Sequence, residues 1–157
     1  MFNAAALINL LGFTVGIALY ALLLLMVVRH RQSKEKNAPD FLLLLTAALG
    51  LLWNAGELAA LFWKDFAAAE ASPALVAAAY SALGFLPSVV VHSAWKSEEN
   101  GNKNVGWLTV AAYILSAFAA ALHFQSAVFQ GNAPSAPALR ALTFGSLALL
   151  GGLWVFT

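Results

Sequence analysis

The sequence predicts an all-α fold, a polytopic membrane bundle of five transmembrane helices. Of its 157 residues, 62% are hydrophobic and 10% are charged, and the mean hydropathy is +0.80. Water-soluble domains are only about half apolar, so this composition indicates a membrane protein. The apolar residues gather in five runs, each about as long as the roughly 20 residues that a helix needs to cross the hydrocarbon core. We expect one transmembrane domain over residues 1–157.

The first two runs are expected to form helices over residues 4–28 and 41–63. The first is long enough to span the bilayer with some tilt. Basic residues follow this run instead of preceding it, which is unlike a cleaved signal peptide and suits a helix inserted with its N-terminus outside. The second run contains Glu57, the only carboxylate that this interpretation puts inside the membrane.

The remaining runs predict helices over residues 73–95, 105–129 and 138–157. Pro87 lies inside the third run and lacks an N–H group, so we expect it to kink that helix and to serve as a hinge. The carbonyl that Pro87 leaves free is expected to be satisfied by Ser88 or by a neighbouring helix.

The basic residues are distributed unevenly between the loops. The loops after the first and third runs hold six of them, whereas the other side holds Lys64 and Arg140. The positive-inside rule therefore predicts an outside N-terminus and, after five crossings, a cytoplasmic C-terminus. A net charge of +1 with scattered cations is not typical of a nucleic-acid-binding protein. The six loop cations are Arg29, Arg31, Lys34, Lys36, Lys96 and Lys103.

This topology puts polar residues from several helices at one depth. Glu57 and His123 each fall roughly 24–27 Å from the cytoplasmic boundary, in the outer leaflet, and Asn9, Asn54 and Tyr80 fall in the same zone. An ionisable group inside a membrane is costly and is a functional-site hypothesis by default. We expect this cluster to bind a cation, to take up a proton or to recognise a polar ligand from outside. The alternatives are an interhelical hydrogen bond between Glu57 and His123, or a Glu57 that is simply hydrated at the interface.

Histidines also raise the question of a metal or porphyrin ligand, for which His92 and His123 are the candidates. His92 is expected near the cytoplasmic side, roughly 20 Å from His123 along the membrane normal, so the two should not ligate one haem. A single axial histidine to haem or chlorophyll stays open. The sequence contains no metalloprotease, nucleotide-binding or serine-hydrolase motif, so we do not expect an enzyme.

One phrase of the third run, FLPSVVVHSAW, has a proline followed five residues later by histidine. It resembles a helix in the multi-pass N-terminal sensor regions of bacterial sensor histidine kinases, where LPxxxxH recurs. INLLGFTVGIALYALLLLMVVRHR and LLLLTAALGLLWNAGELAALFW are similar to the first helices of such regions. The resemblance implies a receptor whose cytoplasmic C-terminus feeds a kinase of a two-component system. The chain departs from this pattern by ending at GGLWVFT, without the last crossings of a seven-helix sensor and without a phosphoacceptor or ATP-binding module. It is thus expected to be an excised sensor region or a stand-alone subunit.

The function expected from these observations is signal input in the bacterial cytoplasmic (inner) membrane. A ligand or proton at the outer cluster would shift the third and fifth helices at Pro87 and signal to a cytoplasmic partner, with no cofactor required. The alternative is a structural or cofactor-holding subunit, with haem or chlorophyll, of a larger redox or photosynthetic complex. Besides the lipid bilayer, the partners are thus a signalling protein or a larger membrane complex. The GxxxG pair of Gly12 and Gly16 predicts packing within the bundle, with a homodimer as the alternative.

Overall fold

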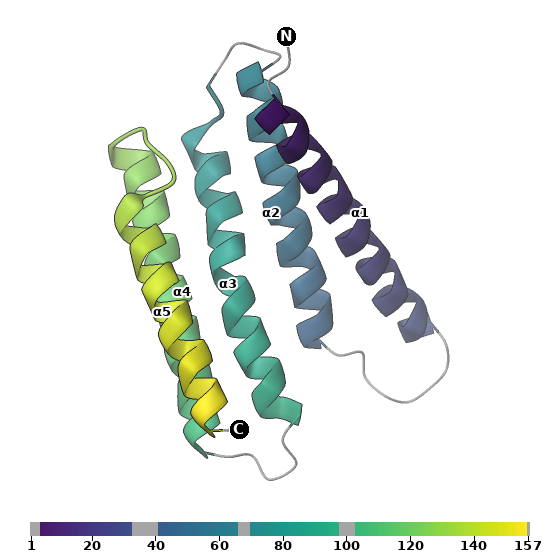
Figure 1. The fold of residues 1–157 in the computed structure, drawn as a ribbon, viewed down its shortest axis with the longest axis vertical. Coiled ribbons are helices and arrows are strands. Elements are labelled where there is room, and N and C mark those ends of the chain that lie inside the picture. Colours follow the sequence, from purple (N-terminus) through teal and green to yellow (C-terminus); the bar gives the residue numbers. More distant parts are fainter. Residues whose placement is uncertain (1–3, 33–40, 66–69, 98–102, 157) are drawn as a thin grey trace.

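The computed structural model describes residues 4–32, 41–65, 70–97 and 103–156, which fold almost entirely into α-helices (Figure 1). The prediction of an all-α chain with five helices is confirmed. Each helix begins and ends within a few residues of its predicted bounds. The helices are α1 (Ala4–Gln32), α2 (Phe41–Asp65), α3 (Pro73–Ser97), α4 (Lys103–Phe129) and α5 (Ala136–Phe156).

Four of these helices, α1 to α4, are long and apolar enough to cross a membrane. Large apolar side chains such as Ile8, Ile114 and Phe118 are exposed on their surfaces, as expected for helices whose outer faces contact lipid. The shorter α5 is not among these four, so the fifth crossing stays a prediction, as does the orientation of both termini.

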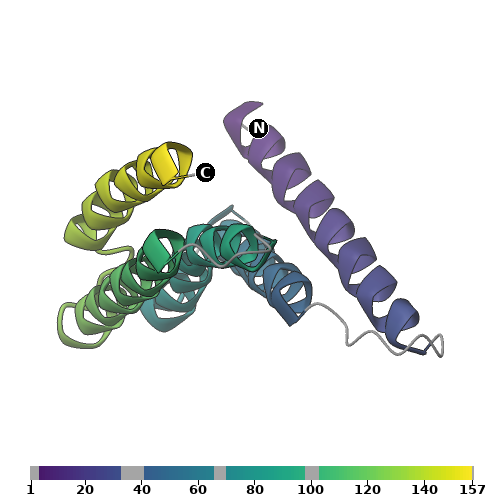
Figure 2. The ribbon, with the colours of Figure 1, turned by 90° about the horizontal axis from the view of Figure 1, so that it is seen from below.

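The helices form an open arc in which each packs on the next in sequence. Contacts join α1 to α2, α2 to α3, α3 to α4 and α4 to α5, and α3 also touches α5. Figure 2 shows α2, α3 and α4 in a row, with α5 and the N-terminal half of α1 on the same side of that row. Within the described residues, α1 and α5 make no contact with each other. The concave side of the arc therefore lies between α1 and α5.

Close packing between α1 and α2 depends on two glycines. Gly16 of α1 lies against Asn54 of α2, and Gly50 of α2 lies against the ring of Tyr20, so that a Cβ at either glycine would overlap the facing side chain. Gly12, by contrast, has open space where a side chain would be. The two glycines of the GxxxG pair therefore differ, since only Gly16 packs within the bundle.

A serine pair joins α3 to α4 beside Pro87. The hydroxyl of Ser116 donates to the carbonyl of Gly84 across 2.7 Å. Its oxygen is also 2.7 Å from the hydroxyl of Ser88, which must be the donor because Ser116 has only one hydroxyl hydrogen. Pro87 cannot donate to the carbonyl of Leu83, one residue before Gly84, so α4 supports the turn that the proline weakens. The helix α3 runs through Pro87 without interruption.

Candidate functional site

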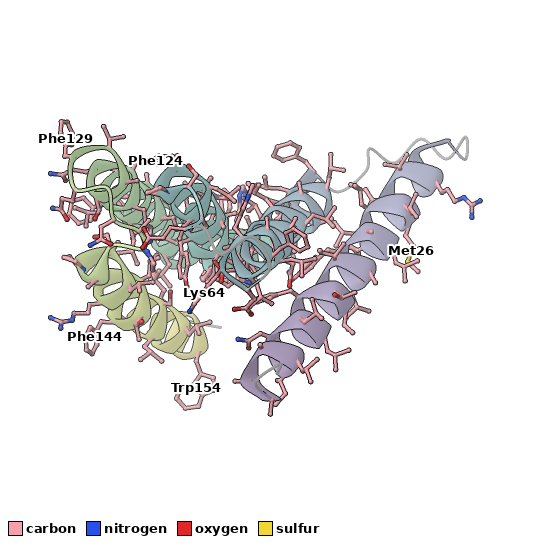
Figure 3. All side chains as sticks on the ribbon, turned by 90° about the horizontal axis from the view of Figure 1, so that it is seen from above. Met26, Lys64, Phe124, Phe129, Phe144 and Trp154 are labelled. Atoms are coloured by element: carbon pink, nitrogen blue, oxygen red, sulfur yellow. The ribbon has the colours of Figure 1, made fainter. Side chains whose placement is uncertain are left out.

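A cavity of about 680 Å³ opens at the end of the bundle where α1 and α3 begin and α2 ends. We call it the Glu57 cavity. Its polar lining comes from α1, α2, the segment before α3 and the loop between α4 and α5. In Figure 3, Lys64 lies in the space between α1 and α5. The polar residues that line the Glu57 cavity are Asn9, Glu57, Lys64, Glu70 and Asn132.

Glu57 is half-buried in the wall of this cavity, whereas Lys64 and Glu70, the other charged residues that line it, are exposed. It precedes the last residue of α2, Asp65, by eight positions, which on a helix corresponds to about 12 Å. It is also the one carboxylate in the interior of a helix among the described residues. Phe13, Ala60 and Leu61 supply apolar surface to the same cavity. The carboxyl group is therefore in surroundings where an unpaired charge is unfavourable.

The charges of the Glu57 cavity do not neutralise one another. Among the described residues that line it, two carboxylates, Glu57 and Glu70, accompany one ammonium group, Lys64, which leaves one negative charge when all three are ionised. Within the described part of the chain, no ion pair joins any two of the three. Lys64 follows Glu57 by seven positions, about 10 Å along α2, which is longer than the three- or four-residue spacing of side-chain pairs on a helix.

His123 does not line the Glu57 cavity. Its side chain is 0% exposed, and its Nδ1 accepts a hydrogen bond of 3.1 Å from the backbone N–H of Ser135. An Nδ1 that accepts carries no hydrogen, so the neutral ring has its hydrogen on Nε2. This Nε2 is buried and finds no hydrogen-bond partner in the described chain. No hydrogen bond joins His123 to Glu57 there, although Tyr80, which packs on His123, lies close enough to Glu57 to interact with its charge.

A row of aromatic rings instead connects His123 to the cavity wall. The ring of Tyr80 is 5.7 Å from that of His123, and Trp53 packs edge-on against Tyr80 with 4.9 Å between ring centroids. Phe13, which lines the cavity, lies edge-on to Trp53 at 6.4 Å. We call Phe13, Trp53, Tyr80 and His123 the aromatic row. It crosses from α1 to α4, and the hydrogen bond to Ser135 extends it to the loop before α5.

The predicted outer cluster is thus divided among three places. Asn9 and Glu57 line the cavity, and Tyr80 and His123 belong to the aromatic row. Asn54 is buried, donates from Nδ2 to the carbonyl of Gly50 in its own helix across 2.7 Å, and packs against α1. Asn54 therefore acts as a packing residue between α1 and α2.

His92 lies in a second polar contact nearer the other end of the bundle. Its Nδ1 is 3.1 Å from the hydroxyl of Tyr113, and its ring lies 5.8 Å from that of Trp95. Tyr113 precedes His123 by ten residues on α4, about 15 Å along the helix, so His92 and His123 are too far apart to ligate one haem.

A metal or porphyrin finds few suitable ligands in this structure. Among the described residues, no three His, Asp or Glu side chains are grouped closely enough to hold a metal ion. The Nε2 atom of His123 is fully enclosed, which leaves no open face on which a haem or chlorophyll could lie. The arrangement around His123 therefore does not fit an axial ligand.

Comparison with known proteins finds no relative. No protein-family model matches the chain, and no curated protein or solved structure matches it.

Sequence reasoning missed several residues of the cavity and of the aromatic row. Phe13 is four residues after Asn9, on the same helical face, and this spacing was the available signal. Trp53 directly precedes Asn54, but its position in the sequence fits an aromatic residue at the membrane interface as well as it fits a member of the aromatic row. No sequence pattern marked Ser135 or Asn132 as a site residue, because both belong to a loop whose position depends on how α5 folds back on α4.

Proposed function

We propose that this chain is a membrane-embedded signal-input domain that binds a small polar ligand in the Glu57 cavity. The observation that carries the proposal is that one cavity is lined by α1, α2, the start of α3 and the loop between α4 and α5. An occupant would touch all of these segments at once, so its binding energy would favour one relative arrangement of the helices over others. A cavity within a single helix pair would not have this property.

The aromatic row supplies a physical connection from the cavity to the far side of the arc. Phe13 is both part of the cavity wall and the first ring of the row. At the other end, His123 holds the backbone of Ser135, directly before α5. A displacement of Phe13 by a ligand would therefore be passed through packed rings toward α5.

The turn at Pro87 is the second part of the proposal, as the point where α3 deforms. The hydrogen bonds of Ser116 to Gly84 and of Ser88 to Ser116 link this turn to α4. A movement of α4 would therefore displace the turn. The side chain of Leu142 in α5 contacts α3 at Gly84, in the same region. Helices α3 and α5 would thus shift together.

The direction of signalling follows from the predicted topology. The loops after α1 and α3 hold most of the basic residues, so the proposal puts the Glu57 cavity on the outer side of a bacterial inner membrane. The helix ends near His92 would then face a cytoplasmic partner. A histidine kinase is the partner that the sequence resemblance implies.

Spin-label distances test whether the cavity controls the arrangement of the helices. The chain has no cysteine, so Met26→Cys and Trp154→Cys can be labelled without other changes. These residues are 66% and 84% exposed and belong to α1 and α5, the two ends of the arc (Figure 3). In the labelled protein, Ala60→Trp places a bulky ring in the cavity wall in imitation of a ligand.

We expect Ala60→Trp to change the distance distribution between the two labels. The matched control is Ala111→Trp, which adds the same ring at an exposed position of α4 outside the cavity lining and should leave the distribution unchanged. Identical distributions in the labelled protein and in the labelled Ala60→Trp variant would refute the proposal.

A further inference from the structure

The Glu57 cavity carries information on the kind of ligand it accepts. Glu57 is the least exposed charged group among the described residues that line the cavity, and no cationic side chain in the described chain forms an ion pair with it. A carboxylate in partly apolar surroundings is stabilised when an opposite charge reaches it. The described residues that line the cavity also include one more carboxylate than ammonium groups. Both observations favour a ligand that presents a cation to Glu57.

The walls next to Glu57 argue for an organic cation over a metal ion. Ca²⁺ takes six to eight oxygen ligands and Mg²⁺ also needs an oxygen-rich shell. Phe13, Ala60 and Leu61 offer none from their side chains, and no three-residue metal group exists among the described residues. An aromatic face, by contrast, attracts ammonium groups, and Phe13 lines the cavity. A volume of about 680 Å³ suits a small organic molecule.

We propose that the Glu57 cavity binds an organic ammonium group, with the Glu57 carboxylate as its counter-ion and the Phe13 ring beside it. This proposal rests on the proposed function, because it names the chemical class of the ligand that the signal-input domain would detect. Lys64, which is exposed, lies about 10 Å from Glu57 along α2 and matches an anionic or polar group at the other end of the ligand.

Two sources present this chemistry at a membrane surface. One is a soluble amine that enters at the helix ends. The other is the ammonium-bearing headgroup of a phospholipid, whose phosphate would face Lys64. Since α1 and α5 make no contact in the described structure, the arc does not close the space between them against lipid.

Ligand binding can be measured directly on the whole chain in micelles of a maltoside detergent, which carries no charge. The probe is n-butylammonium chloride, with n-butanol and sodium butyrate as matched neutral and anionic compounds at constant ionic strength. The readout is the backbone amide NMR signals of Gly131 and Asn132, which line the cavity. We expect saturable shifts with n-butylammonium and not with the other two compounds.

Variants link this response to Glu57. We expect Glu57→Gln to weaken n-butylammonium binding at least tenfold. Asp65→Asn removes the same charge from an exposed position of α2 outside the cavity lining and should leave the affinity unchanged. Phe13→Leu keeps an apolar side chain and removes the ring, so it should weaken binding severalfold. Equal shifts with n-butanol, or equal effects of Glu57→Gln and Asp65→Asn, would overturn the proposal.

A lipid measurement separates the two sources. The chain is reconstituted in vesicles of equal parts phosphatidylethanolamine and phosphatidylglycerol, extracted, and weighed with its retained lipid by native mass spectrometry. Preferential retention of phosphatidylethanolamine, lost in Glu57→Gln, supports a lipid headgroup. Saturable n-butylammonium binding without lipid preference supports a soluble amine. If no ammonium compound binds while Ala60→Trp still changes the spin-label distances, the ligand class is wrong and the signal-input function stands.

Discussion

The backbone N–H of Ser135 lies 3.1 Å from Nδ1 of His123, a side chain that is 0% exposed. This hydrogen bond fixes the loop that leads into α5 to the interior of α4. The ring of Tyr80 packs on His123 from α3, so three segments of the chain meet at one imidazole. His123, which was predicted to face a ligand, is therefore enclosed where α3, α4 and the loop before α5 meet.

Removing the His123 ring should destabilise the protein strongly. His123→Ala leaves a void and an unpaired Ser135 N–H, and such changes together cost about 3–5 kcal/mol. We expect a clear fall in the midpoint of thermal unfolding in detergent. Gln125→Ala, an exposed change two residues along α4, should move the midpoint little. A His123→Ala midpoint no lower than that of Gln125→Ala would show that the hydrogen bond and the ring packing do not stabilise the fold.

The serine pair beside Pro87 predicts unequal effects of two similar substitutions. Ser116→Ala removes the donor to Gly84 and the acceptor of Ser88, whereas Ser88→Ala leaves the bond from Ser116 to Gly84 in place. We expect Ser116→Ala to lower the free energy of unfolding by about 1–3 kcal/mol and Ser88→Ala by less. Thr14→Ala is a control, because that exposed hydroxyl bonds only within its own helix. A larger loss for Ser88→Ala would contradict the assigned donor directions.

The two glycines of the GxxxG pair should respond differently to a bulky side chain. Gly16→Val places methyl groups where Asn54 lies and should separate α1 from α2, with a fall in unfolding midpoint. Gly12→Val enters open space and should be tolerated. If Gly12→Val instead changes the mass of the detergent-solubilised protein in light scattering, Gly12 belongs to a homodimer interface.

Orientation in the membrane can be checked with single cysteines in the cysteine-free chain. Gln130→Cys lies at the cavity end of the bundle and Lys96→Cys at the opposite end, both at exposed positions. In intact spheroplasts, a maleimide that does not cross membranes should label Gln130→Cys, while Lys96→Cys should require permeabilisation. Labelling in the opposite pattern would reverse the predicted topology and put the Glu57 cavity on the cytoplasmic side.

The level of a residue along its helix was more predictable than the neighbouring helix that its side chain faces. Counting residues along α2 and α1 indicated that Glu57 and Asn9 are near one level, and both line one cavity. The same counting put His123 at this level, and its contact with Tyr80 agrees with it. Residue counting did not show that His123 and Glu57 contact different neighbours, because two residues at equal depth can lie on different sides of their helices.

The sequence alone determined that the chain consists of long apolar helices with bounds set by polar, Pro-rich and Gly-rich loops. The physical reason is local, since a backbone in hydrocarbon must satisfy its own hydrogen bonds and does so in a helix. The tertiary structure decided which faces meet. Helices α1 and α4 are apolar on nearly all sides, so hydropathy does not mark the side of either that packs. Only the order of the helices in the arc put Glu57 in an open cavity and enclosed His123 against Ser135.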